Sequence, residues 1–231
     1  VVNRTSFTSN HAYERGGAVN LHASAVHIDD AEFRDNLAIN GSALYIGGIG
    51  TNNMVHESLF EGNNATGYGG GIYWRAHSGE IVNSSFNKNN ALYGGAIYLN
   101  GVSANTNITN TSFSYNSAIK NGGAIDCNAQ NIGIYNLTFI NNYAGEYGAA
   151  LCRESGATGG HGDHNNFTNN HAGIAGAALA WMGVDNIHID YYNFINNTAG
   201  KSGGAIYVSD DSDNCTVHYC YFEGNYITNA S

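Results

Sequence analysis

Hydrophobic and polar residues recur along this chain with a period of 26 to 28 residues. All nine phenylalanines lie in the motif F-x-x-N, and alanine follows two residues after the asparagine in eight of the nine copies. The phenylalanines are Phe7, Phe33, Phe60, Phe86, Phe113, Phe139, Phe167, Phe194 and Phe222, and the asparagines are Asn10, Asn36, Asn63, Asn89, Asn116, Asn142, Asn170, Asn197 and Asn225. A fixed period of this length indicates a stack of similar units.

A second block, G-G-A-[VIL]-Y followed by an apolar residue, comes eight or nine residues after each of the first eight phenylalanines. It is clear at 94–99 and 203–208 and degenerate at 41–46 and 148–152. A short alternating stretch, such as residues 26–28, precedes each phenylalanine. The unit is too short for a pair of packed helices, and its glycine pairs interrupt any helical period. The pattern predicts an all-β fold, a parallel β-helix of about eight to nine coils with three short strands per coil.

Equivalent positions of successive coils form columns about 4.8 Å apart in such a fold. We expect the phenylalanines to stack inside, beside a second inner column of aliphatic residues. That column is Val19, Leu44, Ile72, Ile97, Ile125, Leu151, Leu179 and Ile206. The alanines fit a narrow interior corner, and the asparagines fit a turn where each amide bonds to the backbone or to the next asparagine.

Charge and composition exclude several classes of partner. Eight basic residues accompany 18 acidic ones, a formal net charge of −10, which argues against nucleic acid and anionic lipid as partners. No apolar run approaches the roughly 18–20 residues that span a bilayer, so we expect no membrane insertion by this segment. Proline is absent, as expected where most backbone N–H groups donate to the next coil.

The alternation of F-x-x-N with G-G-A-[ILV] along the chain resembles the passenger repeats of chlamydial polymorphic membrane proteins. It is also similar to the adhesin-like β-helix proteins of methanogenic archaea. The resemblance implies a right-handed parallel β-helix at the cell surface or outside the cell. It further implies adhesion, with a surface protein or glycan of a host or neighbouring cell as the partner.

We interpret residues 1–231 as a single β-helix repeat domain, either a segment of a longer solenoid or a subunit that stacks on copies of itself. Solenoids close their ends with atypical polar units. Neither residues 1–2 nor residues 225–227 have that character. Open strand edges seek partners, so we expect end-to-end self-association.

One candidate site combines histidine and aspartate. His161 and Asp163 flank an inner position of one coil, and His188 and Asp190 flank the same position of the next. Imidazole and carboxylate groups at coil spacing could hold a divalent metal or act as a general acid and base. The alternative interpretation is that outward positions are simply polar.

A second candidate site is a tyrosine column. Tyr45, Tyr73, Tyr98 and Tyr207 share the outward slot of the third strand and could bind a sugar or protein. The alternative is that exposed strands favour tyrosine for β-propensity and stacking alone. Other residues interrupt the column, including Asp126, Cys152 and Ala180 beside Arg153 and Glu154, and we expect specificity to lie at this interruption.

Cysteines and glycosylation motifs add two smaller expectations. The four cysteines are expected to pack as small hydrophobic residues, with Cys215–Cys220 as the candidate if a disulfide forms. Eleven N-x-[ST] sequons are compatible with a glycosylated surface protein. They are Asn3, Asn40, Asn64, Asn83, Asn107, Asn110, Asn136, Asn166, Asn196, Asn214 and Asn229.

Taken as a sequence, the chain is best interpreted as a non-enzymatic cell-surface or extracellular β-helix protein, an adhesin or a stalk-like scaffold. It needs no cofactor unless the histidine–aspartate face binds a divalent metal. One alternative is a polysaccharide-active lyase, hydrolase or epimerase that uses the same face. Another is a structural subunit of an extracellular filament or sheath.

Overall fold

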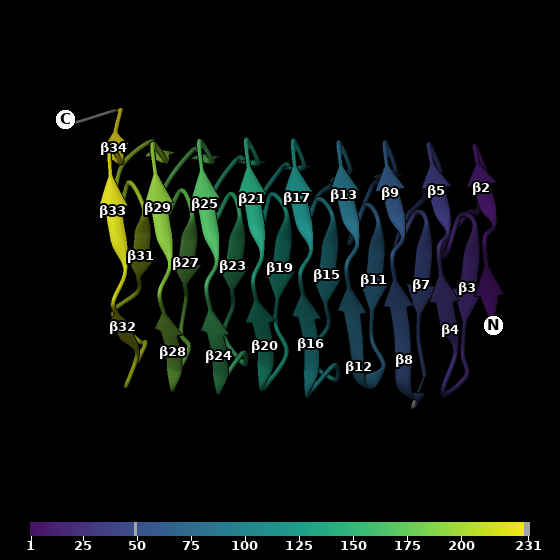
Figure 1. The fold of residues 1–231 in the computed structure, drawn as a ribbon. Coiled ribbons are helices and arrows are strands. Elements are labelled where there is room, and N and C mark those ends of the chain that lie inside the picture. The colour runs from purple at the N-terminus through teal and green to yellow at the C-terminus, as the bar shows by residue number, and fades with distance from the viewer. Residues whose placement is uncertain (49, 229–231) are drawn as a thin grey trace.

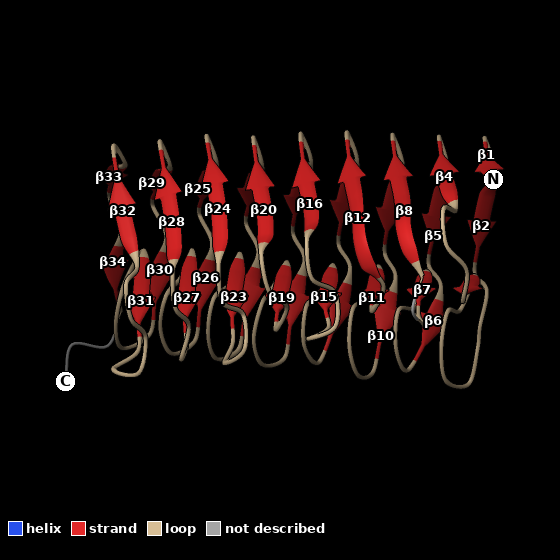
Figure 2. Ribbon diagram, turned by 90° about the horizontal axis from the view of Figure 1, so that it is seen from below, coloured by secondary structure: helices blue, strands red, loops and turns tan. Residues whose placement is uncertain are grey.

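The computed structural model describes residues 1–48 and 50–228 and forms a parallel β-solenoid of about eight turns. Strands of successive coils lie side by side along the rod, from β2 near the N-terminus to β33 near the C-terminus (Figure 1). The described residues contain strands and loops and no helix (Figure 2). None of them therefore forms a helical segment with the length and apolar character of a membrane span. The predicted all-β, parallel architecture is confirmed.

Four parallel sheets run the length of the solenoid. The first comprises β1 (Val2–Asn3), β4 (His27–Asp29), β8 (Thr51–His56), β12 (His77–Val82), β16 (Thr106–Thr109), β20 (Ile132–Tyr135), β24 (Gly160–Asp163), β28 (Ile187–Asp190) and β32 (Thr216–His218). The second comprises β2 (Ser6–Thr8), β5 (Glu32–Arg34), β9 (Leu59–Glu61), β13 (Ser85–Asn87), β17 (Ser112–Ser114), β21 (Thr138–Ile140), β25 (Asn166–Thr168), β29 (Asn193–Ile195) and β33 (Tyr221–Glu223).

The remaining two sheets complete each coil. The third comprises β6 (Leu37–Ala38), β10 (Asn64–Ala65), β14 (Asn90–Ala91), β18 (Ser117–Ala118), β22 (Tyr143–Ala144), β26 (His171–Ala172), β30 (Thr198–Ala199) and β34 (Tyr226–Ile227). The fourth comprises β3 (Val19–Leu21), β7 (Leu44–Ile46), β11 (Ile72–Trp74), β15 (Ile97–Leu99), β19 (Ile125–Cys127), β23 (Leu151–Arg153), β27 (Leu179–Trp181) and β31 (Ile206–Val208).

A full coil thus has four strands, and the expected three is a miscount. The alanine column, assigned to a corner, belongs to the two-residue strands of the third sheet, where Ala38 pairs with Ala65. Two residues are too few to show the alternation of apolar and polar positions that marks a strand in a sequence. The alanines still point inward, because Ala65 and its equivalents are buried.

The phenylalanine column is the centre of the core. Neighbouring rings stack with centroids 4.6–5.1 Å apart and planes within 13° of parallel, from Phe7 to Phe222. The seven rings from Phe33 to Phe194 are fully buried. The second inner column packs beside them, with Leu44 through Leu179 buried as well. Both predicted inner columns are confirmed.

The asparagine column forms a continuous buried ladder at one corner. Asn116 is typical: its Nδ2 donates to Asn142 Oδ1 and to the Phe86 carbonyl, each at 3.0 Å. Its Oδ1 accepts from the backbone N–H and from Nδ2 of Asn89, also at 3.0 Å. One amide therefore satisfies backbone groups that the turn would otherwise leave unpaired.

The first glycine of each pair is required by its backbone. Gly94, for example, has φ +63°, and a Cβ there would lie 2.3 Å from the Ile97 carbonyl oxygen. The left-handed region is costly for residues with a Cβ, so this slot stays glycine in all eight copies. The glycine turns then lead directly into the fourth sheet.

The core departs from its repeat at β24. Gly160 and Gly162 occupy the inner slots of β24 where the paired strand β20 has Ile132 and Ile134. Arg153 and Tyr192 fill the space that the glycines leave. A Cβ on Gly160 would lie 2.7 Å from an Arg153 guanidinium nitrogen, and one on Gly162 would lie 1.6 Å from the Tyr192 hydroxyl oxygen.

All four cysteines lie among the described residues and are free, as the sequence favoured. Cys127 points into the core, and Cys152 points outward from the neighbouring strand. The candidate Cys215–Cys220 disulfide is absent. Glycosylation stays a prediction, and the sequon at Asn229 lies outside the described residues.

Candidate functional surfaces

The first sheet brings the predicted histidine–aspartate residues together. Strands β24 and β28 pair His161 with His188 and Asp163 with Asp190. The two imidazole rings stack with centroids 5.7 Å apart. Register alone places these side chains on one outward face, because parallel strands align equivalent residues of successive coils.

Three of these four side chains also have a neighbour outside the predicted set. His188 Nδ1 lies 2.6 Å from Thr216 Oγ1. Asp163 Oδ1 lies 2.7 Å from His164 Nδ1, and Asp190 Oδ1 lies 3.6 Å from His218 Nδ1. Outward residues two apart on one strand are about 7 Å apart, so histidine and aspartate of the same strand do not converge. Metal binding at this face stays a prediction.

An exposed aromatic row lies at the corner after these strands, and the sequence analysis missed it. His164, Tyr191 and Tyr219 occupy equivalent positions with φ of 51–56°. Their rings stack with centroids 5.1 Å apart, and Tyr191 and Tyr219 are 49% and 77% exposed. The same corner holds Arg4, Asp30 and Glu57 in the first three coils and Asn83, Asn110 and Asn136 in the next three, all with positive φ. Aromatic residues at a corner that earlier coils fill with charged residues or asparagine were the signal available in the sequence.

Together these residues form one surface, which we call the His–Tyr face. It lies over β24, β28 and β32 and the corner that follows them. Its members are His161, Asp163, His164, His188, Asp190, Tyr191, His218 and Tyr219. The face combines stacked aromatic rings with carboxylates and imidazoles at its edge.

The predicted tyrosine column lies on the outer side of the fourth sheet, in register as expected. Tyr45 pairs with Tyr73, and Tyr73 pairs with Tyr98, with ring centroids 4.9 and 5.4 Å apart. The column is more covered than an open strand face, because Tyr45 and Tyr98 are only 3% and 7% exposed. The Tyr68 ring packs 4.6 Å from that of Tyr98.

At the other end of this column Tyr207 is half-buried, with the Tyr147 ring 5.9 Å away. The rings of the column thus pack mainly on other aromatic side chains. Ligand binding by the column stays a prediction, and only Tyr73 and Tyr207 present part of a ring to solvent.

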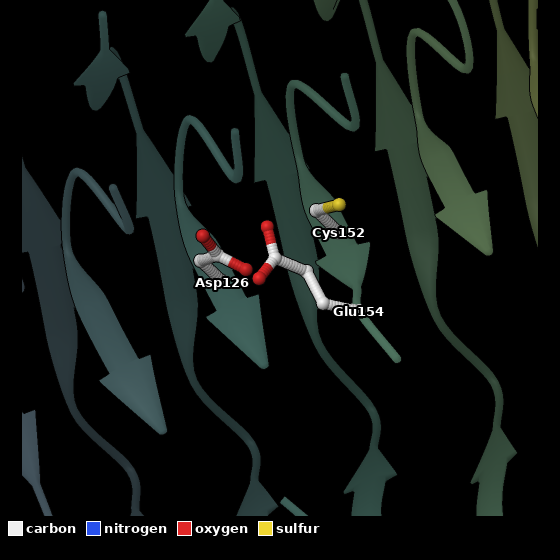
Figure 3. Close-up of side chains that lie close together, drawn as sticks. All are labelled: Asp126, Cys152 and Glu154. Atoms are coloured by element: carbon white, nitrogen blue, oxygen red, sulfur yellow. The ribbon is translucent and has the colours of Figure 1, made fainter. Parts of the chain in front are cut away.

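Where the tyrosine column is interrupted, three reactive side chains converge (Figure 3). Asp126 of β19 and Cys152 of β23 are paired neighbours, and Glu154 follows β23. One carboxylate oxygen from each acid and the Cys152 sulfur lie within 4.8 Å of one another. Asp126 and Cys152 are completely buried, and Glu154 is half-buried. We call this group the acid–thiol cluster.

The hydrogen bonding of the acid–thiol cluster is incomplete. Asn121 donates from Nδ2 to Glu154 Oε1 at 2.8 Å, but its own Oδ1 is buried without a partner. Neither carboxylate oxygen of Asp126 takes part in a hydrogen bond. The Cys152 sulfur lies 3.8 Å from the Met182 sulfur.

Burial sets the proton affinity of the cluster. Burial, and then the negative charge of Glu154, hold the pKa of the Asp126 carboxyl well above its usual range. The Cys127 amide, which is near the carboxyl without good hydrogen-bond geometry, offsets only part of this rise in pKa. Burial, with Asp126 and Glu154, likewise raises the pKa of the Cys152 thiol. Negative charge is therefore disfavoured here unless a cation compensates it.

Arg153 does not supply that cation. Its side chain points inward and is 2% exposed, and its guanidinium donates to the Ile132 carbonyl at 3.2 Å. The sequence predicted specificity beside Arg153 and Glu154. Of these two side chains, only Glu154 is on the outer side of the sheet.

These features define the class of protein: a parallel β-solenoid with a continuous core, repeated coil by coil, that presents side chains on its outer faces. The model for the Chlamydia polymorphic membrane protein repeat matches residues 57–73, 110–128 and 192–209. Each matched segment spans one F-x-x-N motif and the glycine-rich block that follows it. These three segments are therefore similar to the chlamydial polymorphic membrane protein repeat, in agreement with the resemblance. This family is surface-associated, which supports a location at the cell surface in general. No curated protein and no solved structure matches the chain.

Proposed function

We propose that this chain is a non-enzymatic adhesin-like β-solenoid that binds a surface protein or glycan of a host or neighbouring cell through the His–Tyr face. The observation that carries the proposal is the exposed row of stacked aromatic rings at His164, Tyr191 and Tyr219. Tyrosine is enriched at protein interfaces, and its flat ring with a polar tip also suits a sugar.

A contribution to fold stability does not explain why aromatic residues occupy this row. A left-handed backbone costs a residue with a Cβ about 1–2 kcal/mol, and asparagine tolerates it better. Aromatic stacking returns about 0.5–1.5 kcal/mol per pair. Three aromatic residues with two stacked contacts therefore gain less than they lose, whereas asparagine, which three earlier coils have here, loses less. A binding role explains why tyrosine is kept at Tyr191 and Tyr219.

The test compares binding of two variants to a glycan array and to a panel of immobilised extracellular-matrix proteins. Tyr191→Asn with Tyr219→Asn places at this corner the residue that earlier coils already use, so the fold is preserved. Tyr115→Asn is the matched control: Tyr115 is 56% exposed at a different left-handed corner, whose later coils have Asn141 and Asn169.

We expect the double variant to lose at least tenfold in affinity for any probe that the wild type binds, as for two interface anchors. The Tyr115→Asn control should bind like the wild type. Unchanged binding by the double variant would refute a role for the His–Tyr face. A wild-type chain that binds no probe on either surface would favour a stalk or scaffold instead.

A further inference from the structure

The acid–thiol cluster contains a buried carboxyl group that nothing in the described structure compensates. Asp126 is completely buried, both of its oxygens lack hydrogen bonds, and a second carboxylate, Glu154, lies beside it. A buried carboxylate without a partner costs several kcal/mol. The Asn121 amide is engaged with Glu154 and does not reach Asp126 through a hydrogen bond. Within the described structure, no hydrogen-bond donor compensates Asp126.

The spacing of the cluster suits an ion between its members. Zinc binds thiolate sulfur at about 2.3 Å and carboxylate oxygen at about 2.0–2.2 Å, which places neighbouring ligand atoms roughly 3–4 Å apart. The three ligand atoms here lie within 4.8 Å of one another. Glu154 is the mobile member because its side chain is half-exposed, so rotation of one side chain closes the difference. A proton shared by the two carboxyl groups would instead need an Asp126–Glu154 hydrogen bond, which the structure lacks.

The donor set indicates which ion fits. We propose that Asp126, Cys152 and Glu154 form a binding site for a thiophilic divalent cation of the zinc type. Thiolate sulfur selects zinc-like ions over calcium and magnesium, which prefer oxygen ligands alone. The unpaired Asn121 Oδ1 adds an oxygen donor beside the cluster, and the Met182 thioether adds a soft sulfur 3.8 Å from Cys152.

A surface pocket gives a cation access to the site. The pocket has a volume of about 330 Å³ and is lined by Glu154, Ser155, Met182, Ser209 and Asp211. Glu154 and Met182 belong to both the pocket and the surroundings of Cys152. The second carboxylate, that of Asp211, makes the opening acidic and so attractive to cations.

Cadmium is the sharpest probe, since a cadmium–thiolate bond has its own ultraviolet charge-transfer band. The purified chain is titrated with Cd²⁺ and then with Zn²⁺ by absorbance and calorimetry, with Ca²⁺ as the oxygen-seeking comparison. We expect one Cd²⁺ per chain with the thiolate band, competition by Zn²⁺, and no displacement by equimolar Ca²⁺. Binding should release the proton of the Cys152 thiol, because the metal ligand is the thiolate.

Variants separate this site from the rest of the surface. Cys152→Ser should abolish the thiolate band, and Glu154→Gln, which alters a half-exposed side chain and spares the core, should weaken Cd²⁺ binding at least tenfold. Cys215→Ser removes a free thiol elsewhere and should change nothing. Absence of the band in the wild type, its survival in Cys152→Ser, or its loss in Cys215→Ser would each overturn the proposal. Equal affinity of Glu154→Gln and wild type would do the same.

Discussion

Replacing one rung of the buried asparagine ladder tests how the coils are held together. The Asn116 side chain makes four hydrogen bonds, all buried, to groups of the coils before and after it. The change Asn116→Leu keeps a similar volume and removes all four. Three groups then lose their partner: the backbone N–H of Asn89, one N–H of its side chain, and the Phe86 carbonyl.

The expected cost follows from that inventory. Each buried polar group left unpaired costs about 1–3 kcal/mol. Burial of the leucine side chain offsets about 1.5–3 kcal/mol of the total. We therefore expect Asn116→Leu to lower the free energy of unfolding by about 2–6 kcal/mol.

The variant Asn116→Asp adds a pH test. A carboxylate at this position still accepts from Asn89, but it faces the Asn142 Oδ1 and the Phe86 carbonyl with no proton to donate. Burial and these acceptors should raise its folded-state pKa above the unfolded value of about 3.9. The variant should therefore be closest to wild type in its free energy of unfolding below about pH 4, where the carboxyl is protonated. The difference grows as pH rises through the folded-state pKa.

Urea denaturation at pH 3 and pH 7 measures both effects. The control is Asn90→Ser, which removes an exposed amide contact to Asn64 and introduces the residue that β18 has in that register. The control should change the free energy of unfolding by less than about 0.5 kcal/mol. If Asn116→Leu is as mildly destabilising as the control, or if Asn116→Asp is equally destabilising at both pH values, the buried asparagine hydrogen bonds do not stabilise the fold as described.

Three further predictions follow from the same structure. Phe113→Ala, which removes a buried ring stacked 5.0 and 4.9 Å from its neighbours, should cost about 3–5 kcal/mol in urea, and a loss below about 1 kcal/mol would contradict the stack. Asp126→Asn, measured with a chelator, should stabilise the protein more at pH 7 than at pH 4, because the raised pKa of Asp126 makes its ionisation unfavourable to folding. A gain independent of pH would count against that origin. In the Cys152→Ser background, zinc or calcium bound at the His–Tyr face should still raise the melting temperature, and adding Asp163→Asn with Asp190→Asn should abolish that rise. If neither ion raises the melting temperature of Cys152→Ser, the His–Tyr face binds no metal.

The sequence predicted those parts of the fold that repeat in every coil. Phenylalanine, asparagine and the positive-φ glycine each occupy one slot per coil, so their period fixes the inner columns and the register between coils. The fourth strand was missed because Leu37–Ala38 and its equivalents are too short for a pattern. Register also placed Asp126 beside Cys152 correctly.

The surface sites depend on segments that do not repeat. Glu154 reaches back over the sheet from the loop after β23, and Tyr68 covers Tyr98 from a turn one coil away. Neither contact recurs from coil to coil, so neither could be predicted from the spacing of residues in the sequence. The row at Tyr191 and Tyr219 was accessible in principle, because the corner it occupies is asparagine in three earlier coils.

The irregular core at Gly162 and Tyr192 solves a difficulty peculiar to repetitive chains. A chain of nearly identical units can form the same ladders after slipping by one whole coil, since phenylalanine would still meet phenylalanine. At this place a slipped pairing fails, because Tyr192 would meet isoleucine instead of Gly162. Gly162 and Tyr192 therefore distinguish this pair of coils from its near-copies. Gly162→Ile with Tyr192→Ser, which places in both slots the residues that other coils have, should increase the fraction of chains that refold slowly or into swapped, higher-mass species.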